Sequence, residues 1–394
     1  MRFSGAIGHT GSWVRAGAAS ADPYLLRRFF EAPNHNLVAG QSGQAECDSG
    51  WSGERTPRLR RQAPSASRVV ALPEMPPLLS VEGLETHFAT GQGVLRAVDG
   101  VSFNIEKGQV LGLVGESGCG KSVTSLSIMR LVPPPGRIAA GRVLLEGEDL
   151  LAMDAEAMRR VRGARIAMVF QEPMTSLNPV FSIGDQIASA VLAHGGAGHH
   201  EAWERTVEML DLVQIPSARQ RARDYPHQLS GGLRQRAMIA MALASGPALL
   251  IADEPTTALD VTIQAQILDL LRRLQAERGM AVLLITHDLG VVAELCHRVA
   301  VIYAGRIVEM APVANLFARP LHPYTRGLLQ CLPHPSRFGR PLASIEGVPP
   351  DLRQASAGCR FAPRCSYAVA ACRREEPLLE EREPGHFVAC PVVT

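Results

Sequence analysis

The pattern of apolar and polar residues changes near residue 76. Before it, residues 1–75 are rich in Ala, Gly, Ser, Arg and Pro and show no sustained periodicity, which predicts a disordered extension. The basic run Arg58-Leu-Arg-Arg61 leaves a transit peptide or a membrane-tethering tail as alternatives. We favour a third interpretation, a start assigned too early, because Met75-Pro-Pro-Leu-Leu would begin the first strand naturally.

Alternating apolar segments follow from Leu78 to about Val114, with turns such as Asp99-Gly100 between them. This pattern predicts a small antiparallel sheet. Later apolar runs predict strands at 141–146, 166–170, 248–252 and 281–286. The stretches near 153–162 and from 172 to about 244 have a helical pattern.

A strand-helix-strand unit is predicted between residues 248 and 286. Asp260 can cap a helix there, apolar residues recur at three- to four-residue spacing, and Gly279 can end it. Units of this kind imply an α/β fold with a parallel sheet covered on both faces. From 319 onward Pro and Gly interrupt the pattern. We therefore divide the chain into residues 1–75, a main domain at 76–318 with a helical subdomain at about 172–245, and a C-terminal extension at 319–394.

A phosphate-binding loop follows the apolar run that ends at Val114. Its glycines let backbone amides converge on phosphates, Lys121 adds a positive charge, and the Ser122 hydroxyl can ligate Mg²⁺. Of 40 basic residues only Lys107 and Lys121 are lysine, so an arginine-rich chain keeps a compact ammonium at this loop. The loop residues are Gly115, Glu116, Ser117, Gly118, Cys119, Gly120, Lys121 and Ser122.

Two acids end the apolar run Leu249-Leu-Ile-Ala. A buried strand would deliver Asp253 and Glu254 to the carboxyl edge of the sheet, where substrates bind. Because successive strand side chains alternate between faces, we expect separate roles for them. Asp253 would hold Mg²⁺ beside Ser122, and Glu254 would polarise the attacking water.

Ser230-Gly-Gly232 begins another helix and predicts a second anion site, separate from the first loop. The surrounding motif, Leu229 to Arg236, resembles the signature sequence of the ATP-binding cassette ATPases. Leu233 stands where glutamine is usual in that family. The substitution leaves the Ser-Gly-Gly contacts in place.

The resemblance implies roles for four further positions. Gln171 would contact Mg²⁺ or water where the membrane partner docks, and His287 would sense the γ-phosphate. The loop Ala258-Leu-Asp260 would communicate the state of one subunit's site to the other subunit. Phe88 would stack on adenine, with a core position as the alternative.

The extension resembles that of dipeptide and oligopeptide importer ATPases, a subfamily that includes nickel and glutathione importers. Its motifs are Leu321-His-Pro-Tyr-Thr325, Ile345-Glu-Gly-Val-Pro-Pro350 and Gly358-Cys-Arg-Phe-Ala-Pro-Arg-Cys365. Resemblance to this subfamily implies an ATPase that powers uptake through two membrane permeases, to which a substrate-binding protein delivers the solute. It also implies a second, related ATPase subunit, with a homodimer as the alternative.

Four cysteines of the extension predict a metal site. Four thiolates can hold a 4Fe-4S cluster or a zinc ion, and the chain has no Cys-x2-Cys pair of the kind that zinc sites use. Similar tails are associated with a 4Fe-4S cluster, which we favour over zinc and plain thiols. We expect Arg360, Arg364 and Arg373 to offset the thiolate charge, and the phosphate loop to lie in a separate core. The cysteines are Cys359, Cys365, Cys372 and Cys390.

Composition limits the partners. A net charge of +2 argues against a nucleic-acid-binding polycation, and the longest apolar stretch, 237–252, is interrupted by Gly246-Pro247. With no apolar secretory segment at the N-terminus, we expect a cytosolic compartment, peripheral to the inner membrane at its cytoplasmic face. The rival functions are a soluble cassette ATPase in translation or repair and a redox-sensing regulator. Neighbouring permease genes would separate them from an importer.

Overall fold

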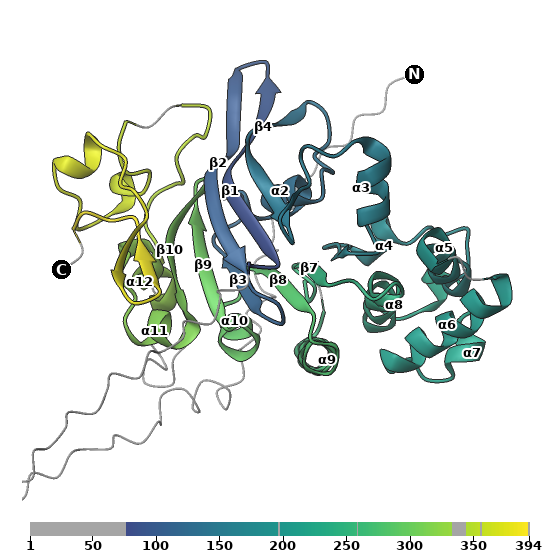
Figure 1. The fold of residues 1–394 in the computed structure, drawn as a ribbon. Coiled ribbons are helices and arrows are strands. Elements are labelled where there is room, and N and C mark those ends of the chain that lie inside the picture. The colour runs from purple at the N-terminus through teal and green to yellow at the C-terminus, as the bar shows by residue number, and fades with distance from the viewer. Residues whose placement is uncertain (1–75, 196–197, 258, 333–343, 355–356, 393–394) are drawn as a thin grey trace, which may run out of the picture.

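The computed structural model describes residues 76–195, 198–257, 259–332, 344–354 and 357–392 (Figure 1). The predictions for residues 1–75 and for Ala258 fall outside these ranges. Two β-sheets occupy the centre, helices α5 to α8 lie at one end, and the C-terminal segment lies at the other (Figure 1).

A parallel sheet forms the core of the molecule, as the strand-helix-strand pattern predicts. Its strand order is β9-β3-β8-β7-β6, and β3, β7 and β8 are buried along their whole length. Helix α9 (Val261–Arg278) connects β7 to β8, capped by Asp260 and ended by Gly279 at a φ of 61°. The parallel strands are β3 (Val110–Val114), β6 (Ile166–Val169), β7 (Leu249–Asp253), β8 (Ala281–Thr286) and β9 (Arg298–Tyr303).

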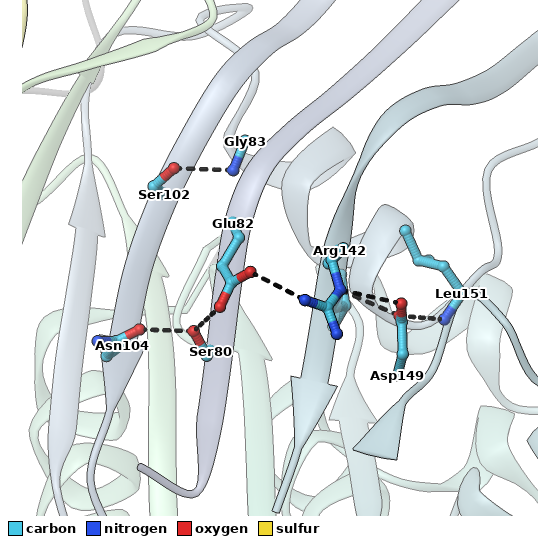
Figure 2. Close-up of polar contacts among 9 residues, drawn as sticks. Ser80, Glu82, Gly83, Ser102, Asn104, Arg142, Asp149 and Leu151 are labelled. Atoms are coloured by element: carbon cyan, nitrogen blue, oxygen red, sulfur yellow. Dashed lines mark hydrogen bonds and ion pairs between the residues drawn. The ribbon is translucent and has the colours of Figure 1, made fainter. Parts of the chain in front are cut away.

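The predicted antiparallel sheet has the order β2-β1-β4-β5. A register shift in β1 leaves the Gly83 amide, at a φ of 56°, without a strand partner, and it donates to the Ser102 hydroxyl at 2.8 Å (Figure 2). Arg142 bridges Glu82 of β1 and Asp149 of β5 (Figure 2). The strands are β1 (Leu79–Thr90), β2 (Gly93–Ile105), β4 (Gly136–Leu145) and β5 (Glu148–Asp149).

Helices cover the sheets, and α5, α6, α7 and α8 form a helical block at one end of the molecule (Figure 1). The predicted helical stretches are present, and α8 packs against β6 and α6. Besides α9, the helices before the core strand β9 are α2 (Lys121–Ile128), α3 (Ala155–Val161), α4 (Pro173–Ser176), α5 (Ile183–Gly195), α6 (His199–Leu212), α7 (Ala218–Arg221), η1 (Pro226–Gln228), α8 (Gly231–Leu243) and α10 (Leu289–Leu295). Among the described residues, no helix is long and apolar enough to span a bilayer.

The C-terminal segment continues the core sheet. Strand β12 pairs with β10, so β11 and β12 extend the same eight-stranded sheet that carries β3. Its elements are β10 (Arg306–Pro312), α11 (Val313–Ala318), α12 (Pro323–Gln330), η3 (Ala362–Arg364), η4 (Ala371–Arg373), β11 (Glu380–Glu383) and β12 (His386–Val388).

A buried carboxylate anchors this segment. Glu309 of β10 accepts hydrogen bonds from the backbone amides of Leu321 and His322, at 2.7 and 2.9 Å, and contacts His386 Nε2 at 2.8 Å. His322 in turn caps α12 by accepting from the Tyr324 amide at 3.0 Å. Glu309 therefore fixes both the start of α12 and the last strand of the segment, β12.

The expectation of a separate core for the phosphate loop is wrong. Val114, the last residue before the loop, shares one apolar cluster with Tyr303, Tyr324 and Phe361. Cys359 and Cys365 pack against the same cluster. A short segment rich in Pro and Gly buries too little apolar surface to order itself, and here it uses the core of the main domain.

Stability should fall in acid because of His322. Burial lowers the pKa of its imidazole to about 3, from 6.5, so the unfolded chain binds a proton that the folded chain excludes between these pH values. The stability is fully present above pH 6.5 and is lost at about 1.4 kcal/mol per pH unit below it.

Calorimetry of the wild type and of His322→Asn, whose amide oxygen can still cap α12, tests this. The variant should have the flatter dependence of melting temperature on pH between 6.5 and 5. Equal slopes would contradict the assignment.

Candidate functional site

The phosphate loop lies between β3 and α2, as predicted. A side chain at Gly115 would place its Cβ 2.2 Å from the Ile302 carbonyl oxygen, and one at Gly120, with a φ of 108°, 2.3 Å from that of Ala97. The backbone is therefore packed tightly on both sides of the loop, while Ser117 and Gly118 at its tip are exposed.

Lys121 is held inside the loop. Its Nζ donates to the carbonyl oxygens of Gly115 and Glu116, at 2.9 and 3.0 Å, and its side chain is buried. The ammonium group thus lies against the backbone of the loop, where it can bind the phosphates of a nucleotide. Cys119 is buried beneath the loop.

Ser122 and Asp253 form the candidate magnesium site. The Ser122 hydroxyl donates to Asp253 Oδ1 at 3.0 Å. Burial, reinforced by the charge of Glu254, raises the pKa of Asp253 to about 6. A cation would offset the charge that burial disfavours, and the donors here are the oxygen ligands that Mg²⁺ prefers. A cavity of about 510 Å³ lined by Ser122, Gln171 and Asp253 adjoins the pair.

Three side chains converge on Glu254. Gln171 Nε2 and the Thr257 hydroxyl donate to its Oε2 at 3.0 and 2.9 Å, and His287 Nδ1 lies 3.4 Å from Oε1. The structure therefore brings together the three predicted catalytic residues, Gln171, Glu254 and His287. We did not predict Thr257; it lies in the turn after Glu254, where its amide donates to the Glu254 carbonyl oxygen.

The separation of Asp253 and Glu254 has a different cause from the one we expected. Strand β7 ends at Asp253, and Glu254 has a φ of 46°. The two carboxylates therefore diverge because the backbone turns after the strand, and strand alternation does not explain it. The Glu254 amide still donates to the Ile285 carbonyl oxygen at 2.9 Å, which ties the turn to β8.

The Ser-Gly-Gly motif lies on the helical block, apart from the phosphate loop (Figure 1). Ser230 caps α8 and accepts from the Leu233 amide at 3.4 Å. Ser230 and Gly231 are exposed, and Gly232 is half-buried. Leu233 packs against the apolar core of the block. The motif thus presents its helix N-terminus to the outside of the molecule.

Asp260 and Phe88 have structural roles, and their roles toward a nucleotide stay predictions. Asp260 accepts from the Ile263 amide at 3.0 Å as the cap of α9, and its side chain is exposed. Phe88, on β1, is half-buried, and its ring lies so close to Gly136 that a Cβ there would meet it at 2.5 Å.

Cys359, Cys365 and Cys372 of the extension are free thiols, and Cys372 and Cys390 are buried. The Cys359 amide donates to the Cys372 carbonyl oxygen at 2.8 Å. Burial raises the pKa of the Cys359 thiol, and Cys390 and Cys372 raise it further. Burial also raises the pKa of Cys365, with a contribution from Cys372. The Cys359 thiol is therefore influenced by Cys372 and Cys390, and the Cys365 thiol by Cys372.

The prediction that arginines offset the thiolate charge is wrong for Arg360 and Arg364. Arg360 pairs with Asp99 and Glu376, and Arg364 forms an ion pair with Glu116 of the phosphate loop. The guanidinium groups are thus committed to carboxylates.

Two family models match the sequence. One, described as "ABC transporter", covers residues 98–257, and the other, "Oligopeptide/dipeptide transporter, C-terminal region", covers 308–372. The matched ranges contain the phosphate loop, the Ser-Gly-Gly motif and three of the four clustered cysteines.

Related proteins cover most of the chain. The "Probable peptide ABC transporter ATP-binding protein y4tR" of Sinorhizobium fredii is 56% identical over 82% of this chain and 97% of its own length. Dipeptide transport ATP-binding proteins DppD of Bacillus subtilis and Escherichia coli are 49% and 48% identical, covering 80% and 79% of this chain and 95% and 96% of their own length. A solved dimer of the ATP-binding cassette MJ0796 with ADP and Pi is 27% identical, with a TM-score of 0.54 over 60% of this chain and 98% of that one.

Proposed function

This chain belongs to the ATP-binding proteins of peptide ABC importers, whose hydrolysis of ATP powers uptake, and we propose that its phosphate loop and the edge around Glu254 form the hydrolytic site. The observation that carries the proposal is the convergence of Gln171, Thr257 and His287 on Glu254. This group lies beside the Ser122–Asp253 pair.

Each group of the site has a distinct task. Lys121 and the loop amides bind the β- and γ-phosphates, and Ser122, Asp253 and Gln171 hold Mg²⁺, which supplies charge neutralisation for phosphoryl transfer. Glu254 accepts a proton from the attacking water. His287, exposed at the rim, contacts the γ-phosphate. Phe88 stacks on adenine.

A second cassette subunit completes the site. Ser230 and Gly231 are exposed at a helix N-terminus that lies apart from the chain's own loop, so an anion bound there belongs to a nucleotide on another subunit. The dimeric state of the MJ0796 cassette supports this arrangement. We propose a heterodimer with a related ATPase, in which Asp260 communicates between the two sites.

Two permeases dock beside Gln171. The segment after β6 exposes large apolar side chains, with Met174, Val180 and Phe181 each more than half exposed. Side chains of this kind fit an apolar partner surface. The chain would then be peripheral, on the cytoplasmic face of the membrane, and a substrate-binding protein would deliver the solute. The names of the relatives favour peptides over nickel or glutathione.

Cys359, Cys365, Cys372 and Cys390 are proposed to hold a 4Fe-4S cluster. Zinc binds thiolates at about 2.3 Å, which places the sulfurs roughly 3.8 Å apart. Among the described residues, the group of three or more candidate ligand atoms that lie within 4.8 Å of one another consists of Glu85, His87 and Asp99. The cysteine sulfurs do not form such a group in the described part of the chain. A cubane binds each thiolate to a different iron and so accommodates a wider spacing.

Glu254→Gln should abolish turnover while retaining ATP. The amide cannot accept the proton of water, so hydrolysis should fall by about 10²- to 10⁴-fold, and ATP should accumulate in a closed dimer. Phosphate release and equilibrium ATP binding measure the two effects. Glu277→Gln, an exposed carboxylate at the far end of α9, is the control. Hydrolysis at the wild-type rate in Glu254→Gln would sink the assignment.

Phe181→Ser with Val180→Ser should prevent assembly with the permeases, because the docking surface loses its exposed apolar area. Co-expression with the permeases, followed by native mass measurement of the purified complex, shows both assembly and subunit composition. Val348→Ser removes an even more exposed apolar side chain, from the C-terminal segment, and should assemble normally. Two identical copies of this chain would overturn the heterodimer, and full assembly of the double variant would overturn the docking surface.

Protein purified without oxygen should be brown, with iron and sulfide each near about four per chain. Cys365→Ser should remove the colour, whereas Cys331→Ser, a half-buried free thiol outside the set, should keep it. One zinc per chain without iron would refute the cluster.

A further inference from the structure

Glu116, the second residue of the phosphate loop, is held by the C-terminal segment. Its carboxylate accepts two hydrogen bonds from Arg364, with Nη1 to Oε2 at 2.7 Å and Nη2 to Oε1 at 3.0 Å. Its amide donates to the Tyr324 hydroxyl at 2.9 Å, and its carbonyl oxygen accepts from Lys121. The Cys119 amide also donates to this carbonyl oxygen, at 3.3 Å. Every polar group of Glu116 therefore has a partner, and two of the four partners come from the C-terminal segment.

The Arg364 side chain is fixed in this position. Only 4% of it is exposed. Its Nε donates to the Glu346 carbonyl oxygen at 3.0 Å and its Nη2 to that of Ile345 at 3.2 Å. The guanidinium also lies over the rings of Tyr303 and Phe361, with its Cζ 5.8 and 6.0 Å from the two ring centroids. Since the donors are spent on fixed acceptors, the carboxylate of Glu116 cannot move without breaking a bidentate pair.

Charge explains why the loop needs this contact. The Glu116 carboxylate belongs to a loop that receives a polyanionic nucleotide, and an unpaired negative charge there would repel the phosphates. Arg364 neutralises the carboxylate and holds it on the side of the C-terminal segment. The Tyr324 contact fixes the backbone of the same residue, so the shape and the charge of the loop entrance are set together.

We propose that Arg364 is a positioning residue for ATP binding, acting through Glu116, so that the cysteine-bearing segment sets the affinity of the phosphate loop. The proposal rests on the proposed use of this loop for ATP. Arg364 directly precedes Cys365, so a rearrangement of the cysteines would reach the nucleotide through this ion pair.

A double-mutant cycle tests the proposal on the full chain. Binding of a radiolabelled, non-hydrolysable ATP analogue with Mg²⁺ is measured for Arg364→Met, Glu116→Gln and the double variant. Arg364→Met should weaken binding on the order of tenfold, because it leaves the carboxylate unpaired. Glu116→Gln should weaken binding less than Arg364→Met, because it removes the repelling charge itself, and its affinity should lie closer to that of the wild type. The double variant should return to within about threefold of it, because the charge is gone.

Two controls separate positioning from folding. Arg319→Met breaks an ion pair with Glu383 elsewhere in the segment and should leave affinity unchanged. If Arg364 only orders the segment, Arg364→Met and the double variant will lose affinity equally, which would overturn the proposal, as would unchanged affinity in Arg364→Met. Should Arg364→Met not fold, Arg364→Lys replaces it, with a smaller loss that Glu116→Gln must again relieve.

The wild type and Lys121→Ala test the premise separately. Loss of binding in Lys121→Ala shows that the loop holds the nucleotide. A wild type that does not bind, or Lys121→Ala with unchanged affinity, would overturn the proposed function itself.

Discussion

The site depends on parallel pairing among β3, β8, β7 and β6. Because the strands run in one direction and in register, with Val114 beside Thr286 and Asp253 beside Ile285, their carboxyl ends meet at one edge of the sheet. The residues that follow them, in the phosphate loop, at Glu254, at His287 and at Gln171, therefore share that edge although long segments separate them in the chain.

The C-terminal segment is part of this construction. Glu309 fixes the start of α12 and strand β12 with one buried carboxylate, and Tyr324 and Arg364 of the same segment contact the phosphate loop. The motif that contains His322 and Tyr324 thus has a structural role. His322 caps the start of α12, and the hydroxyl of Tyr324 accepts a hydrogen bond from the backbone of the phosphate loop.

Local features were predictable, and long-range pairings were not. The strands, the Asp260 cap and the grouping of Gln171, Glu254 and His287 depend on short patterns and on the common edge of parallel strands. The Arg364–Glu116 pair spans 248 residues, and with 40 basic and 38 acidic residues no pattern singles it out. The same limit explains the errors over the arginine partners and the separate core. The turn at Glu254 was not predicted either. Its backbone has a positive φ and donates a hydrogen bond to the Ile285 carbonyl oxygen of β8, a contact between residues distant in the sequence.

The most direct test of this account is the structure of Glu254→Gln bound to ATP and Mg²⁺ in complex with its partner ATPase. We predict the phosphates on Lys121 and the loop amides, the metal between Ser122 and Asp253, and the partner's Ser-Gly-Gly helix against the γ-phosphate. The Arg364–Glu116 pair should remain closed. A nucleotide bound elsewhere, for example in the cavity of about 600 Å³ beside Arg306, would contradict the account.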